Sequence, residues 1–209
     1  MNLRLKKEEK IKLLGADSVY DIMQRVLLRE SLIDRKREHF WTLCMDNANR
    51  LLNIELVSMG TATATLVEPM EVLSVPLQKH AVKLILVHNH PSGELQPSAA
   101  DKDITDNLIQ AARIVKLSVL DHLIISEKAY YSFAETGLMT ELFQSLKYVP
   151  LYELKKRFEQ VGKEIGNEEG RLEERKVIAR QMKKAGYTNE AIIHLTGLSK
   201  TVVARLKGE

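Results

Sequence analysis

Alternation of apolar and polar positions divides the first two thirds of the chain into strands and helices. Apolar residues at every second position predict strands, and apolar residues three or four positions apart predict helices. The predicted strands cover 38–46, 50–59, 82–88, 118–126 and 129–133, and the predicted helices cover 17–28, 70–79 and 98–116. This succession predicts an α/β domain in which a mixed β-sheet is flanked by helices.

Start and stop signals refine two of these helices. Asp17-Ser18 is typical of a helix cap, and Pro69 suits the first turn of the next helix. Pro76 lies inside that second helix, where proline removes a hydrogen bond and costs about 3 kcal/mol. We therefore expect a kink or break near Val75.

The strand at 82–88 carries the most informative stretch. Its apolar run at 84–87 predicts burial on both faces of the sheet. His88 and His90 are two positions apart, so an extended chain points both imidazoles to the same face. Pro91 cannot donate to a ladder and should end the strand, which leaves both rings at its end.

A carboxylate follows on the next helix. Ser98 opens the helical pattern and places Asp101 in its first turn. Two nitrogens and one oxygen can take three corners of a tetrahedron and leave the fourth for water, as in a catalytic zinc site. Each residue also has an ordinary explanation, because strand-end histidines are often hydrogen-bonded surface residues and Ser98 with Asp101 matches a capping box. The joint pattern favours metal binding by His88, His90 and Asp101.

The same pattern resembles a known motif. His88-x-His90, ten residues, then Asp101, with Ser98 three positions before it, resembles the JAMM motif of the MPN/JAB metallohydrolases. The resemblance implies a zinc cofactor held by the two histidines and the aspartate. It also implies that the Ser98 hydroxyl stabilises an oxyanion.

Two longer strings, at 86–93 and 119–125, resemble the RadC branch of that superfamily, and the similarity runs over about 16–139. Members carry an upstream glutamate followed by an aromatic residue, and Glu38 occupies that place. The resemblance implies that Glu38 is the general acid and base. Asp121-His122, inside the second string, marks a strand entrance or supplies a carboxylate that orients a ligand.

Two functions follow as expectations. The first is a zinc metallohydrolase that cleaves amide or isopeptide bonds of a peptide or protein substrate, with Glu38 accepting a proton from metal-activated water. The alternative is a RadC-like, DNA repair-linked accessory protein whose metal site is vestigial or structural.

Charge is unevenly distributed along the chain. Residues 1–37 carry 10 Lys and Arg against 6 Asp and Glu, residues 38–150 carry 8 against 13, and residues 151–209 carry 13 against 9. Basic flanks around an acidic centre are either solvated helical segments or contacts for an anion, of which nucleic acid is the leading candidate.

The C-terminal string at 186–206 resembles a helix-turn-helix. Thr188 and Ser199 are helix caps eleven positions apart, and Gly197 supplies the turn between them. Ile193 departs from the usual pattern because its bulk should push the two helices apart. The last helix should present Lys200, Thr201 and Arg205. DNA binding and a structural or self-association role both remain open.

The expected organisation is a helical segment at 1–37, a RadC-like metallohydrolase domain at 38–139 and a helical tail at 140–209. No run approaches the roughly 18 apolar residues of a membrane span, and the N-terminus does not read as a signal peptide. The single cysteine, Cys44, excludes an internal disulfide framework and reads as a core residue. We therefore expect a cytoplasmic protein.

Overall fold

The computed structural model describes residues 2–3, 12–60, 67–154, 156 and 168–206. The chain forms two compact units, Met1–Phe143 and Gln144–Glu209. The described part of the segment at 1–37 belongs to the first unit. The pattern of apolar residues at 6–14 predicts a short amphipathic helix, but most of that range lies outside the described residues.

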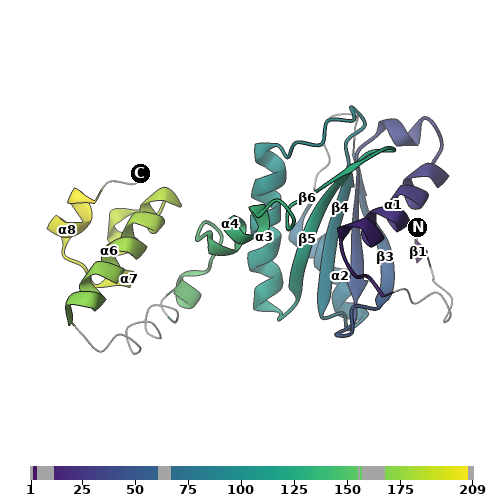
Figure 1. The fold of residues 1–209 in the computed structure, drawn as a ribbon. Coiled ribbons are helices and arrows are strands. Elements are labelled where there is room, and N and C mark those ends of the chain that lie inside the picture. Colours follow the sequence, from purple (N-terminus) through teal and green to yellow (C-terminus); the bar gives the residue numbers. More distant parts are fainter. Residues whose placement is uncertain (1, 4–11, 61–66, 155, 157–167, 207–209) are drawn as a thin grey trace. The chain divides into compact units, whose positions relative to one another are not determined.

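A six-stranded sheet forms the centre of the first unit, in the order β1-β3-β2-β4-β5-β6 (Figure 1). β4 and β5 run parallel, and the other neighbours pair antiparallel. The sheet is therefore mixed, as the sequence predicts. The strands are β1 (Asn2–Leu3), β2 (His39–Met45), β3 (Leu51–Met59), β4 (Lys83–Asn89), β5 (Ser118–Ile125) and β6 (Tyr130–Ser132).

Helices cover both faces of this sheet (Figure 1). α1 (Ala16–Arg29) packs on one face through a core that includes Ile85 and Val87. α2 (Pro69–Gln78) and α3 (Ala99–Ile114) pack on the other through a core that includes Leu84 and Leu86. β4 thus contributes alternate side chains to two cores, which confirms the predicted burial on both faces.

Two predictions about helix ends are wrong. α1 begins after Gly15, where the Ser18 hydroxyl accepts from the Leu14 and Gly15 amides, so Asp17-Ser18 lies inside the helix and not at its cap position. α2 continues through Pro76 to Gln78 without the break expected near Val75. Pro76 lacks the N–H that would bond to the Val72 carbonyl, but its ring is buried and contributes to packing.

The second unit holds the C-terminal helices. α6 (Glu168–Lys184), α7 (Asn189–Thr196) and α8 (Lys200–Arg205) share a small core that includes Met182, Ile192 and Val203. Another short helix, α4 (Leu138–Gln144), spans the boundary between the units.

The predicted helix-turn-helix caps are confirmed. The Thr188 side chain accepts from the Ala191 amide, and the Ser199 side chain accepts from the Val202 amide. Gly197 ends α7 with φ 66°, a left-handed conformation that glycine adopts without steric cost. Ile193 is half-buried and packs against the core of the unit, where the sequence pattern had suggested that its bulk would separate the helices.

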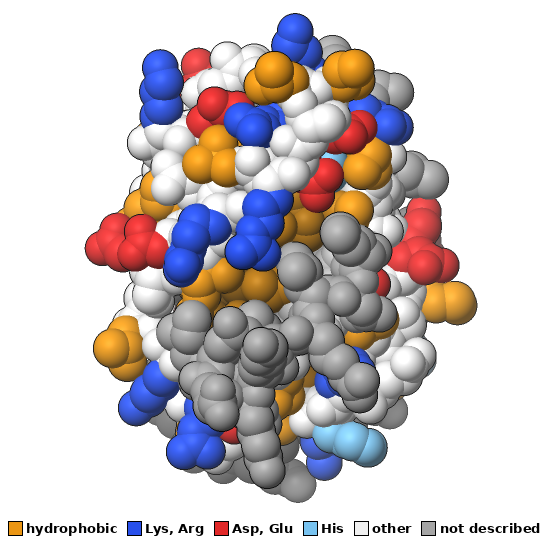
Figure 2. Space-filling view, turned by 90° about the vertical axis from the view of Figure 1, so that its right-hand side faces the viewer, with side chains coloured by type: hydrophobic (Ala, Val, Ile, Leu, Met, Phe, Trp, Pro, Cys, Tyr) orange, Lys and Arg blue, Asp and Glu red, His pale blue; other side chains and the backbone are white. Residues whose placement is uncertain are grey.

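Charge, hydropathy and the single cysteine add three observations. The α1 side of the first unit shows basic and acidic side chains intermixed and not a field of one sign (Figure 2). Among the described residues, we find no helix with both the length and the apolar character needed to cross a membrane. Cys44 is fully buried, and burial raises the pKa of its thiol to about 12, as a core residue requires.

Candidate metal centre

Two histidines and one aspartate meet beyond the end of β4. His88 is in the strand, His90 follows it directly, and Asp101 comes from the first turn of α3. One ligand atom of each lies within 4.8 Å of the other two. His88 Nε2 is 2.9 Å from His90 Nε2 and 3.3 Å from Asp101 Oδ1, and His90 Nε2 is 3.7 Å from Asp101 Oδ2. The three predicted ligands therefore form one cluster.

The helix cap and the cluster share Asp101. Its amide donates to the Ser98 hydroxyl over 3.1 Å, and its Oδ2 accepts from the Ser98 amide over 2.7 Å. This capping box fixes the carboxylate at the start of α3, from where Oδ1 faces His88. Capping and ligation are thus compatible. The hydroxyl of Ser98 acts as an acceptor in the cap and keeps its own proton for another bond.

The chemistry of these donors fits a cation. His90 Nδ1 lies 2.6 Å from the carbonyl oxygen of Glu94, which can only accept, so Nδ1 carries the proton and Nε2 holds a lone pair. His90 Nε2, His88 Nε2 and the Asp101 carboxylate converge on one point. Converging acceptors are stabilised by a metal ion, and a set of imidazole and carboxylate ligands suits zinc better than magnesium or calcium.

Asp101 is held as an anion. Burial opposes its ionisation, but hydrogen bonds and charge from His88 together with the bonds from Ser98 outweigh this effect and hold the pKa of Asp101 well below its usual range. The side chain remains 17% exposed, against 4% for the side chain of His88. One side of the cluster is therefore open to solvent.

Glu38 directly precedes β2, the strand that lies beside β4. β2 pairs with β4 so that Phe40 lies opposite His88, with the two rings stacked at 6.2 Å. The β2–β4 pairing ends at Phe40 and His88, and Glu38 precedes β2 directly, at the same end of the strand as this pair. Its side chain is half-buried. This placement is compatible with the general-base role that the family resemblance implies.

Sequence reasoning missed two residues behind His88. His88 Nδ1 lies 2.8 Å from His122 Nε2, and His122 Nδ1 lies 2.7 Å from the Thr105 hydroxyl. Burial lowers the pKa of His122 well below its usual range, and the nearby His88 adds to the effect, so the ring is neutral. β5 pairs Ile124 with His88, and alternation turns His122 to the same face, but this pairing is known only from the tertiary structure.

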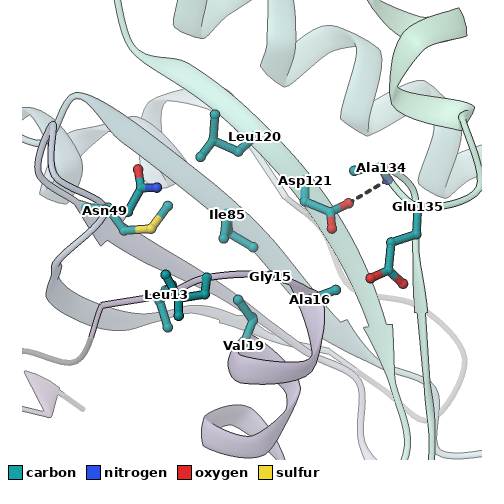
Figure 3. A pocket seen from close by; sticks show the side chains of 12 residues that line it. Leu13, Gly15, Ala16, Val19, Asn49, Ile85, Leu120, Asp121, Ala134 and Glu135 are labelled. Carbon is teal, nitrogen blue, oxygen red and sulfur yellow. Dashed lines mark hydrogen bonds between the residues drawn. The ribbon is translucent and has the colours of Figure 1, made fainter.

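Asp121 faces the other side of the sheet. Its carboxylate accepts from the Ser132 hydroxyl and from the amides of His122 and Ala134. It lines a cavity of about 260 Å³ against the start of α1, among mostly apolar side chains (Figure 3). The idea that Asp121 orients a metal ligand is therefore wrong, and His122 is the member of this pair that contacts the site.

Comparison with known proteins gives a consistent family. A family model described as the RadC-like JAB domain matches residues 15–138, more than half of the chain. The UPF0758 protein of Pelodictyon phaeoclathratiforme is 42% identical over 106 residues, which cover 51% of this chain and 48% of that protein. A UPF0758 protein of Chlorobium phaeovibrioides is 36% identical over 138 residues, covering 66% of this chain and 60% of the relative.

A third relative, a UPF0758 protein of Symbiobacterium thermophilum, is 44% identical over 103 residues, covering 49% of this chain and 44% of that protein. The chain thus spans roughly half of the curated relatives it matches. The matched region contains the whole sheet apart from β1, together with the His88, His90 and Asp101 cluster. On this evidence the chain belongs to the RadC-like JAB domain family.

Proposed function

We propose that this chain is a zinc-dependent hydrolase of amide or isopeptide bonds. The observation that carries the proposal is the convergence of His88, His90 and Asp101 at an exposed strand end. Three protein ligands with a solvent-open side are typical of catalytic zinc sites, whereas structural sites have four protein ligands.

Each group at the site has a separate task in this proposal. A zinc ion bound there would supply Lewis acidity and make hydroxide available at neutral pH. Glu38, half-buried at the start of the strand that pairs with β4, accepts a proton from the attacking water and returns it to the leaving amine. The Ser98 hydroxyl donates to the developing oxyanion, a contribution of about 3 kcal/mol for one such donor.

The exposed loop beside the cluster leaves room for a long peptide substrate. The loop that joins β4 to α3 exposes Ser92, Gly93, Glu94 and Gln96. A site beside an exposed loop is accessible to an extended peptide or to an isopeptide branch on a folded protein. This access supports a peptide bond as the scissile group.

Metal-dependent cleavage of a peptide library provides the test. The zinc-loaded full chain should cleave members of the library, and the same preparation stripped with a chelator and assayed without zinc should lose that activity. Re-addition of zinc should restore it. A chain that holds one zinc per molecule yet cleaves no member would instead favour the accessory role with a non-catalytic metal.

The C-terminal unit supports a second proposed function, which is binding of duplex DNA. α7 and α8 are joined by only three residues, with both helices capped by side chains. Lys183 Nζ donates to the Leu206 carbonyl oxygen over 2.8 Å and so ties the end of α8 to α6. The result is a fixed helix-turn-helix with α8 as its second helix.

The exposed face of α8 has the chemistry of a groove-binding surface. Lys200, Thr201, Ala204 and Arg205 are exposed, while Val203 is buried in the core of the unit. Residues 191–206 contain no Asp or Glu. Small side chains between two cations allow a helix to approach base edges while the cations contact phosphates.

Salt dependence tests this second function on the full chain. Affinity for duplex DNA should fall by about 0.9 log unit per log unit of salt for each phosphate contacted. Lys200→Ala with Arg205→Ala should flatten that slope by about 1.8, since two contacts are lost. The matched control, Lys79→Ala with Lys128→Ala, removes the same charge from exposed positions of the first unit and should leave the slope unchanged. Equal slopes for both pairs, or self-association without DNA binding, would contradict the assignment.

A further inference from the structure

The protonation of His88 decides whether it can bind a metal. Its Nδ1 and the Nε2 of His122 are 2.8 Å apart, and a hydrogen bond between two imidazole nitrogens needs one donor and one acceptor. If neutral His122 donated, His88 would accept at Nδ1 and carry its proton on Nε2, facing the cluster. Only the opposite direction leaves a lone pair on His88 Nε2 for a metal.

Thr105 sets that direction. Its hydroxyl is within hydrogen-bond distance of the Asp101 carbonyl oxygen, which can only accept, so the single hydroxyl proton goes there. The same oxygen lies 2.7 Å from His122 Nδ1 and must therefore accept from it. His122 then has its proton on Nδ1 and a lone pair on Nε2, which accepts the Nδ1 proton of His88.

Packing holds the rings in this arrangement. His122 is fully buried, with the Phe133 ring centroid at 4.8 Å and the Phe40 centroid at 5.6 Å. A buried ring between two aromatic side chains has no water to replace either hydrogen bond. The sequence of donors is therefore Thr105 to the Asp101 carbonyl, His122 to Thr105, and His88 to His122.

We propose that Thr105 and His122 are positioning residues that hold His88 in its metal-binding tautomer. The relay starts at the main chain of one ligand, Asp101, and ends at the side chain of another, His88. The backbone carbonyl of Asp101 thereby sets the tautomer of His88. A hydrogen bond from the non-ligating nitrogen of a metal-bound histidine typically raises metal affinity 10- to 100-fold. This inference rests on the metal site of the proposed function.

Two threonine substitutions test the relay. Thr105→Val keeps the shape of the side chain and removes the hydroxyl, whereas Thr105→Ser restores a hydroxyl. We expect zinc affinity, measured by competition with a chelator, to fall about 10- to 100-fold in the valine variant and to recover in the serine variant. Thr196→Val is the matched control, because Thr196 is also buried and also donates to the carbonyl four residues earlier, in the second unit.

Nitrogen-15 NMR of the imidazoles provides a readout that needs no metal. In the metal-free wild-type chain, the Nδ1 atoms of His88 and of His122 should both be protonated. In Thr105→Val, the Nδ1 atom of His122 should lose part of its proton occupancy and that of His88 should follow it. A wild-type His88 whose Nδ1 carries no proton would overturn the proposal, even if the valine variant failed to fold.

The outcomes also separate this inference from the function on which it rests. Unchanged zinc affinity and unchanged tautomers in Thr105→Val would overturn the relay and leave the metal site in place. A wild-type chain that bound no zinc would contradict the proposed hydrolase, while the tautomers of the metal-free chain would still decide whether the relay exists.

Discussion

Replacing Glu38 by Gln is expected to lower the rate of peptide cleavage by about 100- to 10,000-fold while zinc binding stays at the wild-type level. The amide has nearly the shape of the carboxylate but cannot accept the proton of the attacking water. Glu38 directly precedes β2, the strand that pairs with β4, and is outside the cluster of His88, His90 and Asp101, so metal binding should not depend on it. The measurements are turnover of a library-derived peptide and zinc content of the same preparations.

Glu94→Gln is the matched control for this substitution. This substitution makes the same change in charge beside the site, and Glu94 contacts His90 only through its backbone carbonyl. It should retain most of the turnover. If Glu38→Gln lost zinc as readily as a ligand variant does, the glutamate would be a ligand and the general-base role would be wrong.

Loss of a proposed ligand should weaken zinc binding itself, unlike the Glu38 substitution. His90→Ala and Asp101→Asn are each expected to weaken zinc binding by more than the roughly 100-fold that outer hydrogen-bond partners contribute, because a metal–ligand bond is removed. Asp101→Asn is informative because the amide oxygen can still accept from the Ser98 amide and keep α3 capped. Elemental analysis should find close to one zinc per wild-type chain and far less in both variants.

His194→Ala serves as the control for these ligand variants. His194 is exposed on α7, in the second unit, and its loss should leave zinc content unchanged. Thermal unfolding of each variant without metal would show whether the fold persists. Retention of one zinc by both His90→Ala and Asp101→Asn would remove the basis for the metal site.

The elements of the first unit could be predicted because their patterns are local. Strands β2 to β6 lie within two residues of the predicted boundaries, since alternation records directly which side chains face the cores. The errors fall at helix ends, where the outcome depends on neighbours. Ser18 bonds to the turn that precedes α1, and the buried ring of Pro76 is accommodated in the last turn of α2.

The cluster of His88, His90 and Asp101 could also be predicted from the sequence, because local geometry places its members. Positions 88 and 90 share a face of any strand, and Asp101 must lie in the first turn of a helix that Ser98 caps. Those local rules bring the three ligands to one end of β4 as soon as α3 packs on the sheet. Glu38 needed the additional knowledge of which strand lies beside β4, and the family resemblance supplied it.

The sequence by itself determined strands β2 to β6, the three candidate metal ligands and the capped helix-turn-helix, because each depends on residues that are close along the chain. Only the tertiary structure decided that His122 lies behind His88 and that Asp121 faces the cavity on the other side of the sheet. Thr105, His122 and His88 come from a helix and two strands, and their hydrogen bonds exist only once those elements pack. The direction of the hydrogen bonds in that relay follows from the Asp101 carbonyl. The position of this backbone group cannot be predicted from the pattern of side chains along the sequence.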